Sequence, residues 1–203
     1  FIPLNFDVSD LPATKTALQT LPSHVLNNLD VLVNNAGLAL GLEPADKTDF
    51  ADWQQMVNTN ILGLIHLTHE ILPFMVANND GYIINLSSTA GNYPYFGGNV
   101  YGATKAFVTQ FSLNLRADLV GKNIRVSNIE PGLCGGTEFS NIRFHGDDAK
   151  AAQVYNSVQY VTPQDIANMV AWLIEQPKHV NINRIEVMPT AQTFAGLKVV
   201  KDL

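Results

Sequence analysis

The chain has 203 residues, of which 46% are hydrophobic and 15% are charged, and this composition is typical of one globular domain with a sizeable core rather than of a disordered chain. Its net charge of −6 and its lack of any run of Lys or Arg argue against a nucleic-acid partner and an anionic membrane surface. The single cysteine, Cys134, excludes an intrachain disulfide, and no basic segment followed by an apolar run opens the sequence, so we expect a cytoplasmic protein.

Short β-branched segments alternate along the chain with longer segments of helical periodicity. In chain order, the patterns predict a strand over 2–8 that ends at Asp7, a helix over 11–21, a strand over 30–37, one long helix or two joined near Asn60 over 49–78, a strand over 81–88, a helix over 101–119, a strand over 124–132, a helix over 162–176 and a strand over 184–189. Thr162 is the expected N-cap of the last helix, with Pro163 in its first position. Polar residues and Pro73 interrupt the apolar stretch 61–76, which indicates a buried helix and not a membrane span.

Strands that alternate with helices predict βαβ units and an α/β fold with a parallel sheet. Ligands of such sheets bind at the carboxyl ends of the strands. Asp7, Asn34–Gly37, Ser87–Ser88 and Pro131–Gly132 all follow predicted strands. The sequence therefore predicts one binding site at this edge.

The segment from Cys134 to Val161 is the least regular part of the sequence. A long connection at the strand-end edge is a candidate lid over a bound ligand. A surface insertion without a role is the other interpretation.

Tyr101 and Lys105 are four residues apart on a predicted helix and therefore share one face. A lysine ammonium beside a phenol favours the ionised phenol, which prepares a tyrosine for proton transfer to a carbonyl or from an alcohol. Ser88 lies thirteen residues before Tyr101 and is a candidate hydrogen-bond donor to the reacting oxygen, with Ser87 as its competitor. An ordinary helix carries a Tyr–Lys pair often by chance, so the surrounding motifs decide the interpretation.

Taken together, the motifs resemble the classical short-chain dehydrogenase/reductase family. The matching features are Asp7–Val8 after a strand, NNAG at Asn34–Gly37, Asn60 in the next helix, Ser88 with Tyr101 and Lys105, and Pro131–Gly132. The strings NNAGLALG, GGNVYGATKAF and EPGLCGGTEFSN are similar to the branch of NADP-dependent 3-hydroxy acid dehydrogenases, also called serine 3-dehydrogenases or malonic semialdehyde reductases. The resemblance implies a Rossmann-type doubly wound sheet in three αβα layers, forming a single NAD(P)-binding domain over residues 1–203.

One departure from the family is large. The family begins with a strand, a glycine-rich TGxxxGxG turn and a helix, and then a second strand whose end selects NAD or NADP, and none of these is found in the sequence. We expect a segment of roughly one βαβ unit to precede Phe1, which an intact-mass measurement would test. The branch resemblance implies NADP(H), and NAD(H) stays open because the selecting residues have no counterpart.

The resemblance also implies catalytic roles. Tyr101 is the general acid in reduction and the base in oxidation, Lys105 lowers the pKa of the phenol and binds the nicotinamide ribose, and Ser88 fixes the substrate oxygen. The carbonyl of Asn60 holds a water that links Lys105 to solvent, unless Asn60 is only a tolerated polar residue.

The cofactor would contact residues after several strands. Asn34, Ala36 and Gly37 would lie against it, while Asn35 either binds it or joins neighbouring strands. Asp7 would accept from the adenine amino group, unless it is a helix N-terminal charge. Besides Lys105, the remaining contacts that the resemblance implies are Val8, Tyr101, Pro131, Gly132 and Thr137.

Substrate recognition depends on a cation near the irregular segment. Arg143 is a candidate for binding the carboxylate of a 3-hydroxy acid, and Lys150 is the other nearby cation; a solvated arginine is the alternative for Arg143. Cys134 is expected to be a packing residue, and the five histidines show no metal-binding spacing, so no metal is expected.

Three further expectations complete the sequence analysis. Serine, allo-threonine and 3-hydroxypropionate are the expected substrates. The alternatives are a 3-oxoacyl-carrier-protein reductase, or another small carbonyl reductase, and a catalytically silent nucleotide-binding scaffold. The family resemblance implies a homodimer or homotetramer, to which the apolar tail over residues 191–203 would contribute.

Overall fold

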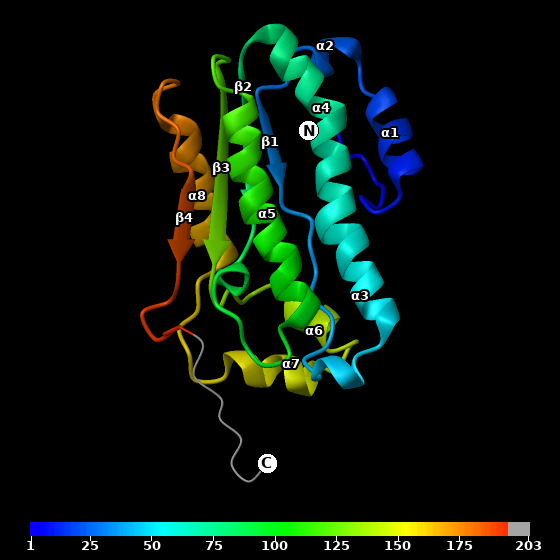
Figure 1. Cartoon of the computed structure of the whole chain (residues 1–203), viewed down its shortest axis with the longest axis vertical. Helices are drawn as coiled ribbons and strands as arrows, with labels where there is room; N and C mark the ends of the chain where they lie inside the picture. Colours follow the sequence, from blue (N-terminus) through cyan, green and yellow to red (C-terminus); the bar gives the residue numbers. More distant parts are fainter. Residues whose placement is uncertain (195–203) are drawn as a thin grey trace.

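The computed structural model describes residues 1–194. Its centre is a parallel sheet of four strands in the order β1 (Val31–Asn34), β2 (Gly81–Leu86), β3 (Ile124–Pro131) and β4 (Arg184–Val187) (Figure 1). The register sets Leu32 beside Ile83 and Ile83 beside Val126. All four strands therefore end at the same edge of the sheet.

Helices cover both faces of the sheet, which makes three layers (Figure 1). On one face, Ile71 and Met75 of α4 (Leu64–Asn78) and Leu115 of α5 (Asn99–Asp118) pack against Ile83. On the other face, Leu173 of α8 (Pro163–Glu175) packs in a cluster that includes Tyr82, Ile84 and Ile129. Every residue of β2 is buried because both of its faces are covered, and the Rossmann-type fold predicted from the sequence is confirmed.

The other helices lie at the ends and sides of these layers. They are α1 (Leu11–Gln19), α2 (Ser23–Leu26), η1 (Ala45–Lys47), α3 (Phe50–Val57), the π-helical segment η2 (Asn58–Gly63), η3 (Thr89–Gly91), α6 (Phe139–Arg143) and α7 (Asp148–Tyr155). The short helices α6 and α7 lie beyond the carboxyl ends of the strands (Figure 1). The sequence analysis expected an irregular segment there, and α2 was not predicted.

Local sequence explains where α8 begins. The Thr162 hydroxyl accepts from the Asp165 amide, and the Asp165 carboxylate accepts from the Thr162 amide. This reciprocal pair satisfies two amide groups that the helix leaves free, and Pro163 fits the first turn because no intrahelical amide donor is needed there. The predicted N-cap is confirmed.

The predicted strand over 2–8 is wrong for the part of the chain that the structure describes. Residues 1–7 have no assigned secondary structure, and the hydrogen bond from Asp10 N to Asp7 O begins a turn. A strand needs a hydrogen-bonded neighbour, and β1 pairs with β2 alone among the described strands. The apolar pattern of these residues was therefore not sufficient to define a strand.

The helical stretch Phe50–Asn78 is long and apolar enough to cross a membrane by length and composition. Met56, Leu64, Ile71 and Met75 of this stretch are buried, and α4 packs against β1 and β2. This arrangement is that of a core helix, as the sequence analysis expected. Residues 195–203, which include most of the predicted tail, lie outside the described part of the chain.

Candidate active site

A cavity of about 790 Å³ opens at the carboxyl ends of the strands. Residues that follow β1, β2, β3 and β4 line it, together with residues of α5, α6, α7 and α8. The cavity therefore lies at the edge of the sheet where the sequence analysis expected a binding site. Its lining includes Ser88, Tyr101, Lys105, Pro131, Gly132, Thr137 and Arg143.

Tyr101 and Lys105 lie in the first two turns of α5 and are both buried, with exposed fractions of 8% and 6%. The Lys105 Nζ atom lies 5.9 Å from the centroid of the Tyr101 ring. It donates a hydrogen bond of 2.9 Å to the carbonyl of Leu86, the last residue of β2. Tyr101 and Lys105 therefore share one face of α5, as predicted, and the Lys105 ammonium is hydrogen-bonded to the end of β2.

Burial dominates the protonation of both groups. It raises the pKa of Tyr101 to about 12, against smaller effects of hydrogen bonding from Ser88 and the charge of Arg143, which lower it. It also lowers the pKa of Lys105 to about 8. In the protein without ligands the pKa of the phenol is raised overall, because desolvation of the phenolate outweighs hydrogen bonding and the charge of Arg143.

Ser88 is the N-cap of η3, where its hydroxyl accepts from the amide of Ala90 and donates to the carbonyl of Pro131 at 3.2 Å. The competing Ser87 hydroxyl is buried and donates to the carbonyl of Lys105 at 2.6 Å. Ser87 thus stabilises the contact between β2 and α5, which favours Ser88 as the donor to a substrate.

Asn60 lies in the π-helical segment η2 and is 1% exposed. Its Oδ1 accepts from the amide of Leu38, and its Nδ2 donates to the carbonyl of Leu38 and to the hydroxyl of Thr104. The π-helix widens the turn at the point where the sequence placed a junction between helices. Asn60 therefore ties the segment after β1 to α5 beside Lys105.

The two asparagines at the end of β1 have different surroundings. Asn34 is buried, and its Nδ2 donates to Asn85 on β2 and to Thr68 on α4. Asn35 lines the cavity instead. Gly37 also lines it, and a Cβ there would lie 3.2 Å from Lys105 Nζ.

The structure does not bring three predicted cofactor residues to the cavity wall. Asp7 is exposed, and its Oδ1 accepts from the amide and hydroxyl of Ser9, which lowers the pKa of the carboxyl. Val8 lies against η2, where a Cβ on Gly63 would come within 2.9 Å of it. Ala36 is exposed and is not among the lining residues either.

The turn after β3 is closed by a residue that sequence reasoning missed. Gly132 N donates to Val187 O, and a Cβ on Gly132 would lie 2.3 Å from Gln192 Oε1. That oxygen accepts from Leu133 N at 2.7 Å. No local signal marks Gln192, because its role depends on the path of the chain after β4. Thr137 lines the cavity nearby and accepts from Phe139 N.

Arg143, at the end of α6, lies among three aromatic rings. Its guanidinium carbon is 5.1 Å from the Tyr101 ring centroid and 5.5 Å from that of Phe139, and its Nη2 donates to the Tyr95 hydroxyl at 2.6 Å. Its buried Nε atom has no hydrogen-bond partner among the described residues. Tyr95 and Phe139 were not predicted as site residues. Lys150, the other candidate cation, is exposed and pairs with Asp147 away from the cavity.

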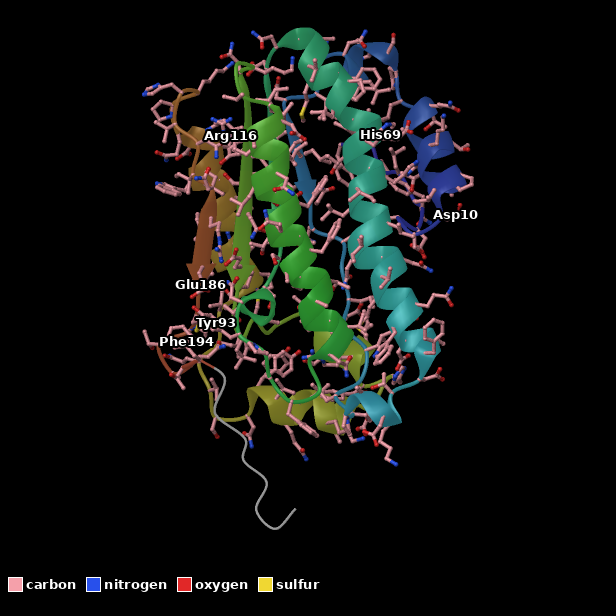
Figure 2. All side chains as sticks on the ribbon, viewed as in Figure 1. Asp10, His69, Tyr93, Arg116, Glu186 and Phe194 are labelled. Atoms are coloured by element: carbon pink, nitrogen blue, oxygen red, sulfur yellow. The ribbon has the colours of Figure 1, made fainter. Side chains whose placement is uncertain are left out.

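A further aromatic wall lies at the ends of β3 and β4. The rings of Tyr93 and Phe194 are in tilted contact with centroids 4.5 Å apart, and the Tyr93 hydroxyl donates to Glu186 of β4. Figure 2 labels these three residues close together near the carboxyl end of β4. Tyr93 and Phe194 line the cavity, and the sequence analysis named neither.

Cys134 lines the cavity as well, and burial raises the pKa of its thiol, so it is not an activated nucleophile. Among the described residues, no group of three His, Cys, Asp or Glu side chains is arranged to hold a metal ion.

Comparison with known proteins identifies the family to which the chain is similar. The family model for short chain dehydrogenases matches residues 1–147. A probable NADP-dependent dehydrogenase of Haemophilus influenzae is 69% identical over 202 residues, covering 100% of this chain and 80% of that protein. An NADP-dependent 3-hydroxy acid dehydrogenase of Escherichia coli is 56% identical, covering 95% and 77%.

The fold is also close to a solved structure. The closed form of a serine dehydrogenase complexed with NADP+ superposes with a TM-score of 0.94 at 55% identity, covering 97% of this chain and 79% of that one. Since the family model covers well over half of the chain, the protein belongs to the short-chain dehydrogenase family.

Proposed function

We propose that this protein is an NADP-dependent oxidoreductase that interconverts short 3-hydroxy acids with their 3-oxo acids or semialdehydes. The observation that carries the proposal is the pairing of Tyr101 with Arg143, whose guanidinium lies 5.1 Å from the phenol ring in one cavity. A proton-transfer group and a carboxylate receptor are thus adjacent. The relatives named as 3-hydroxy acid and serine dehydrogenases support the same substrate class.

The cavity fits a dinucleotide. Its volume of about 790 Å³ exceeds what a short hydroxy acid needs. Gly37 and Gly132 lack the Cβ atoms that would contact Lys105 and Gln192, so their backbone stays open to the cavity. NADP(H) supplies or accepts the hydride when it is bound. The residues proposed to hold it are Asn35, Gly37, Lys105, Pro131, Gly132 and Thr137, with NAD(H) as the alternative. Asn34, Ala36, Asp7 and Val8 have weaker support because they do not line the cavity.

In this mechanism Tyr101 protonates the carbonyl oxygen during reduction and accepts the hydroxyl proton during oxidation. The Ser88 hydroxyl donates to the same oxygen and stabilises its developing negative charge. Lys105, with its pKa lowered to about 8, can carry a proton at neutral pH, and the buried Asn60 lies near it, since a Cβ on Gly37 would contact both side chains.

Arg143 is proposed to bind the substrate carboxylate. The Tyr95 hydroxyl accepts from Nη2, and the buried Nε has no hydrogen-bond partner among the described residues. A planar guanidinium can bind a carboxylate with two parallel hydrogen bonds. We expect serine, allo-threonine and 3-hydroxypropionate to be substrates. We further propose a cytoplasmic homodimer or homotetramer, which size measurement in solution would test.

Oxidation of these hydroxy acids with NADP+ and with NAD+ tests the proposal directly. The Tyr101→Phe and Ser88→Ala variants are expected to lose turnover by at least about 100-fold while still binding NADPH. Turnover by Tyr101→Phe at the unaltered rate would support the silent-scaffold alternative instead. Preference for carrier-bound 3-oxoacyl substrates would support the reductase alternative. The net charge of −6 disfavours this alternative, because carrier proteins are bound through basic surfaces.

A further inference from the structure

We propose that Asn92 is a positioning residue for Ser88: its side chain holds the loop that carries the Ser88 hydroxyl against β3 and β4. The inference rests on the proposed function, in which Ser88 donates to the reacting oxygen. Asn92 itself is not among the residues that line the cavity. Turnover therefore depends on a side chain that acts only through the serine.

The Ser88 hydroxyl is weakly fixed by its own contacts. It donates to the Pro131 carbonyl at 3.2 Å, which is long for a hydrogen bond between two oxygen atoms. The hydroxyl can therefore turn toward a substrate oxygen at little cost. Its location is set by the backbone instead, and Ser88 is followed by the three-residue turn η3, which is too short to be stable without outside support.

The side chain of Asn92 supplies this support at the other end of η3. Asn92 is the C-cap of the turn, and its backbone amide donates to Thr89 O at 3.0 Å. Its Nδ2 donates to Glu130 Oε2 at 2.6 Å and to Glu186 Oε2 at 2.9 Å. Its Oδ1 accepts from Arg184 Nη2 at 2.9 Å. Each of the three side-chain bonds has a charged partner, and such bonds are stronger than those between neutral groups.

Both attachments of the loop lead to one point on β3. Glu130 binds Asn92 and directly precedes Pro131. The Pro131 carbonyl in turn accepts from Ser88. Glu130 is completely buried, and its other carboxylate oxygen accepts from the Thr109 hydroxyl of α5. The same carboxylate is thus bonded to the loop and to the helix that carries the proton-transfer tyrosine, so Asn92 fixes the serine hydroxyl relative to the phenol.

A substitution of Asn92 should lower turnover without weakening cofactor binding. Asn92→Leu keeps the volume of the side chain and removes all three bonds, while the carboxylate of Glu130 retains Arg184. We expect kcat for hydroxy acids to fall about 10-fold, because a small displacement of a reacting group is costly. The Kd for NADPH, measured by fluorescence titration, should stay unchanged, because Asn92 does not line the cavity.

Combination with Ser88→Ala distinguishes positioning of the serine from a general effect on the fold. If Asn92 acts through the Ser88 hydroxyl, Asn92→Leu should not lower kcat further in a protein that lacks this hydroxyl. We therefore expect Ser88→Ala and the double variant to have equal kcat, measured at high enzyme concentration. A structural disturbance does not depend on the hydroxyl and would lower kcat by the same factor in both backgrounds.

A second substitution and a control complete the experiment. Asn92→Asp has the same shape, retains the acceptor for Arg184 and loses both donor bonds, so it should reproduce the loss of kcat and its dependence on Ser88 even where Asn92→Leu fails to fold. Asn114→Leu replaces an exposed asparagine on α5 and should leave kcat unchanged.

The two proposals fail separately. Undiminished turnover by the Asn92 variants, or an equal loss in both backgrounds, would overturn this inference and leave the proposed function standing. Undiminished turnover by Ser88→Ala would overturn the role of Ser88 in the proposed function.

Discussion

Glu130, near the end of β3, and Arg184, the first residue of β4, are joined by two parallel hydrogen bonds of 2.7 Å. Glu130 is completely buried, whereas the Arg184 side chain is 41% exposed. Asn92, at the end of η3, donates to the same carboxylate at 2.6 Å. The buried carboxylate thus joins both strands to the loop that carries Ser88.

This pair gives the first prediction. Arg184→Met leaves the buried carboxylate without its cation and should lower the free energy of unfolding by about 3 kcal/mol. This loss is at the lower end of the range for broken buried ion pairs, because the hydrogen bonds from Asn92 and Asn128 to the carboxylate remain. Chemical denaturation at neutral pH measures the loss. The double variant Glu130→Gln/Arg184→Met is the control, since it removes both charges and should recover part of the stability. A double variant less stable than the single one would contradict this account.

Lys105 makes the stability of the ligand-free protein depend on pH. Burial lowers its pKa from 10.5 to about 8, so between these values the unfolded chain binds more protons than the folded chain, and stability rises as pH increases through this window. Tyr101 acts in the opposite sense above pH 10, because its raised pKa makes the folded state retain a proton that the unfolded state releases.

Replacement of Lys105 by Met should therefore stabilise the ligand-free protein at pH 7 by roughly 3 kcal/mol and abolish turnover. Urea denaturation at pH 7, 8 and 9.5 measures both the gain and the flattening of the pH dependence. Lys122→Met, at an exposed lysine, is the matched control and should change neither. A Lys105→Met protein less stable than the parent at pH 7 would show that the Leu86 hydrogen bond outweighs desolvation.

Asn60 is the third test, because one side chain satisfies both the amide and the carbonyl of Leu38. Asn60→Ala leaves these two backbone groups unpaired and should cost about 2–3 kcal/mol. Asn60→Asp retains the acceptor for the Leu38 amide but loses both donors. We expect its stability to lie between those of the parent and the alanine variant, measured by thermal unfolding. Equal stability of all three proteins would mean that solvent replaces these bonds.

Gly132 provides a rescue experiment. In Gly132→Ala the new Cβ would meet Gln192 Oε1 at 2.3 Å and displace it from the Leu133 amide. We expect KM for the cofactor to rise at least about 10-fold, because the turn against the cavity shifts. Gly132→Ala/Gln192→Ala removes the clash and should recover most of the affinity, as measured by NADPH fluorescence titration. If the double variant binds no better than Gly132→Ala, the displaced side chain is not the cause.

Features set by local periodicity were predictable from the sequence. Tyr101 and Lys105 share a face because helical spacing requires it, and Thr162 caps α8 through residues three apart. The burial of Asn34 could also have been inferred, since Asn34 has the same parity along β1 as the buried Leu32.

Features set by the path of the chain were not predictable. Tyr95 and Gln192 reach the cavity from loops and Phe139 from the short helix α6, and the course of these segments depends on tertiary packing that no periodic pattern marks. Residues 1–7 have a strand-like sequence without a hydrogen-bonded neighbour in the described structure. The pKa of Tyr101 depends on how completely the phenol is desolvated, which residue spacing does not reveal.

The two ends of the segment that carries α6 and α7 are fastened together. Cys134 and Val161 form a parallel bridge, with hydrogen bonds from Val161 N to Leu133 O and from Gly135 N to Val161 O. The segment between them therefore leaves and re-enters the fold at one point. Under the proposed function, changes of length or sequence within this segment would alter the surroundings of the substrate, including Arg143 and Phe139, without moving Tyr101 and Lys105 on α5.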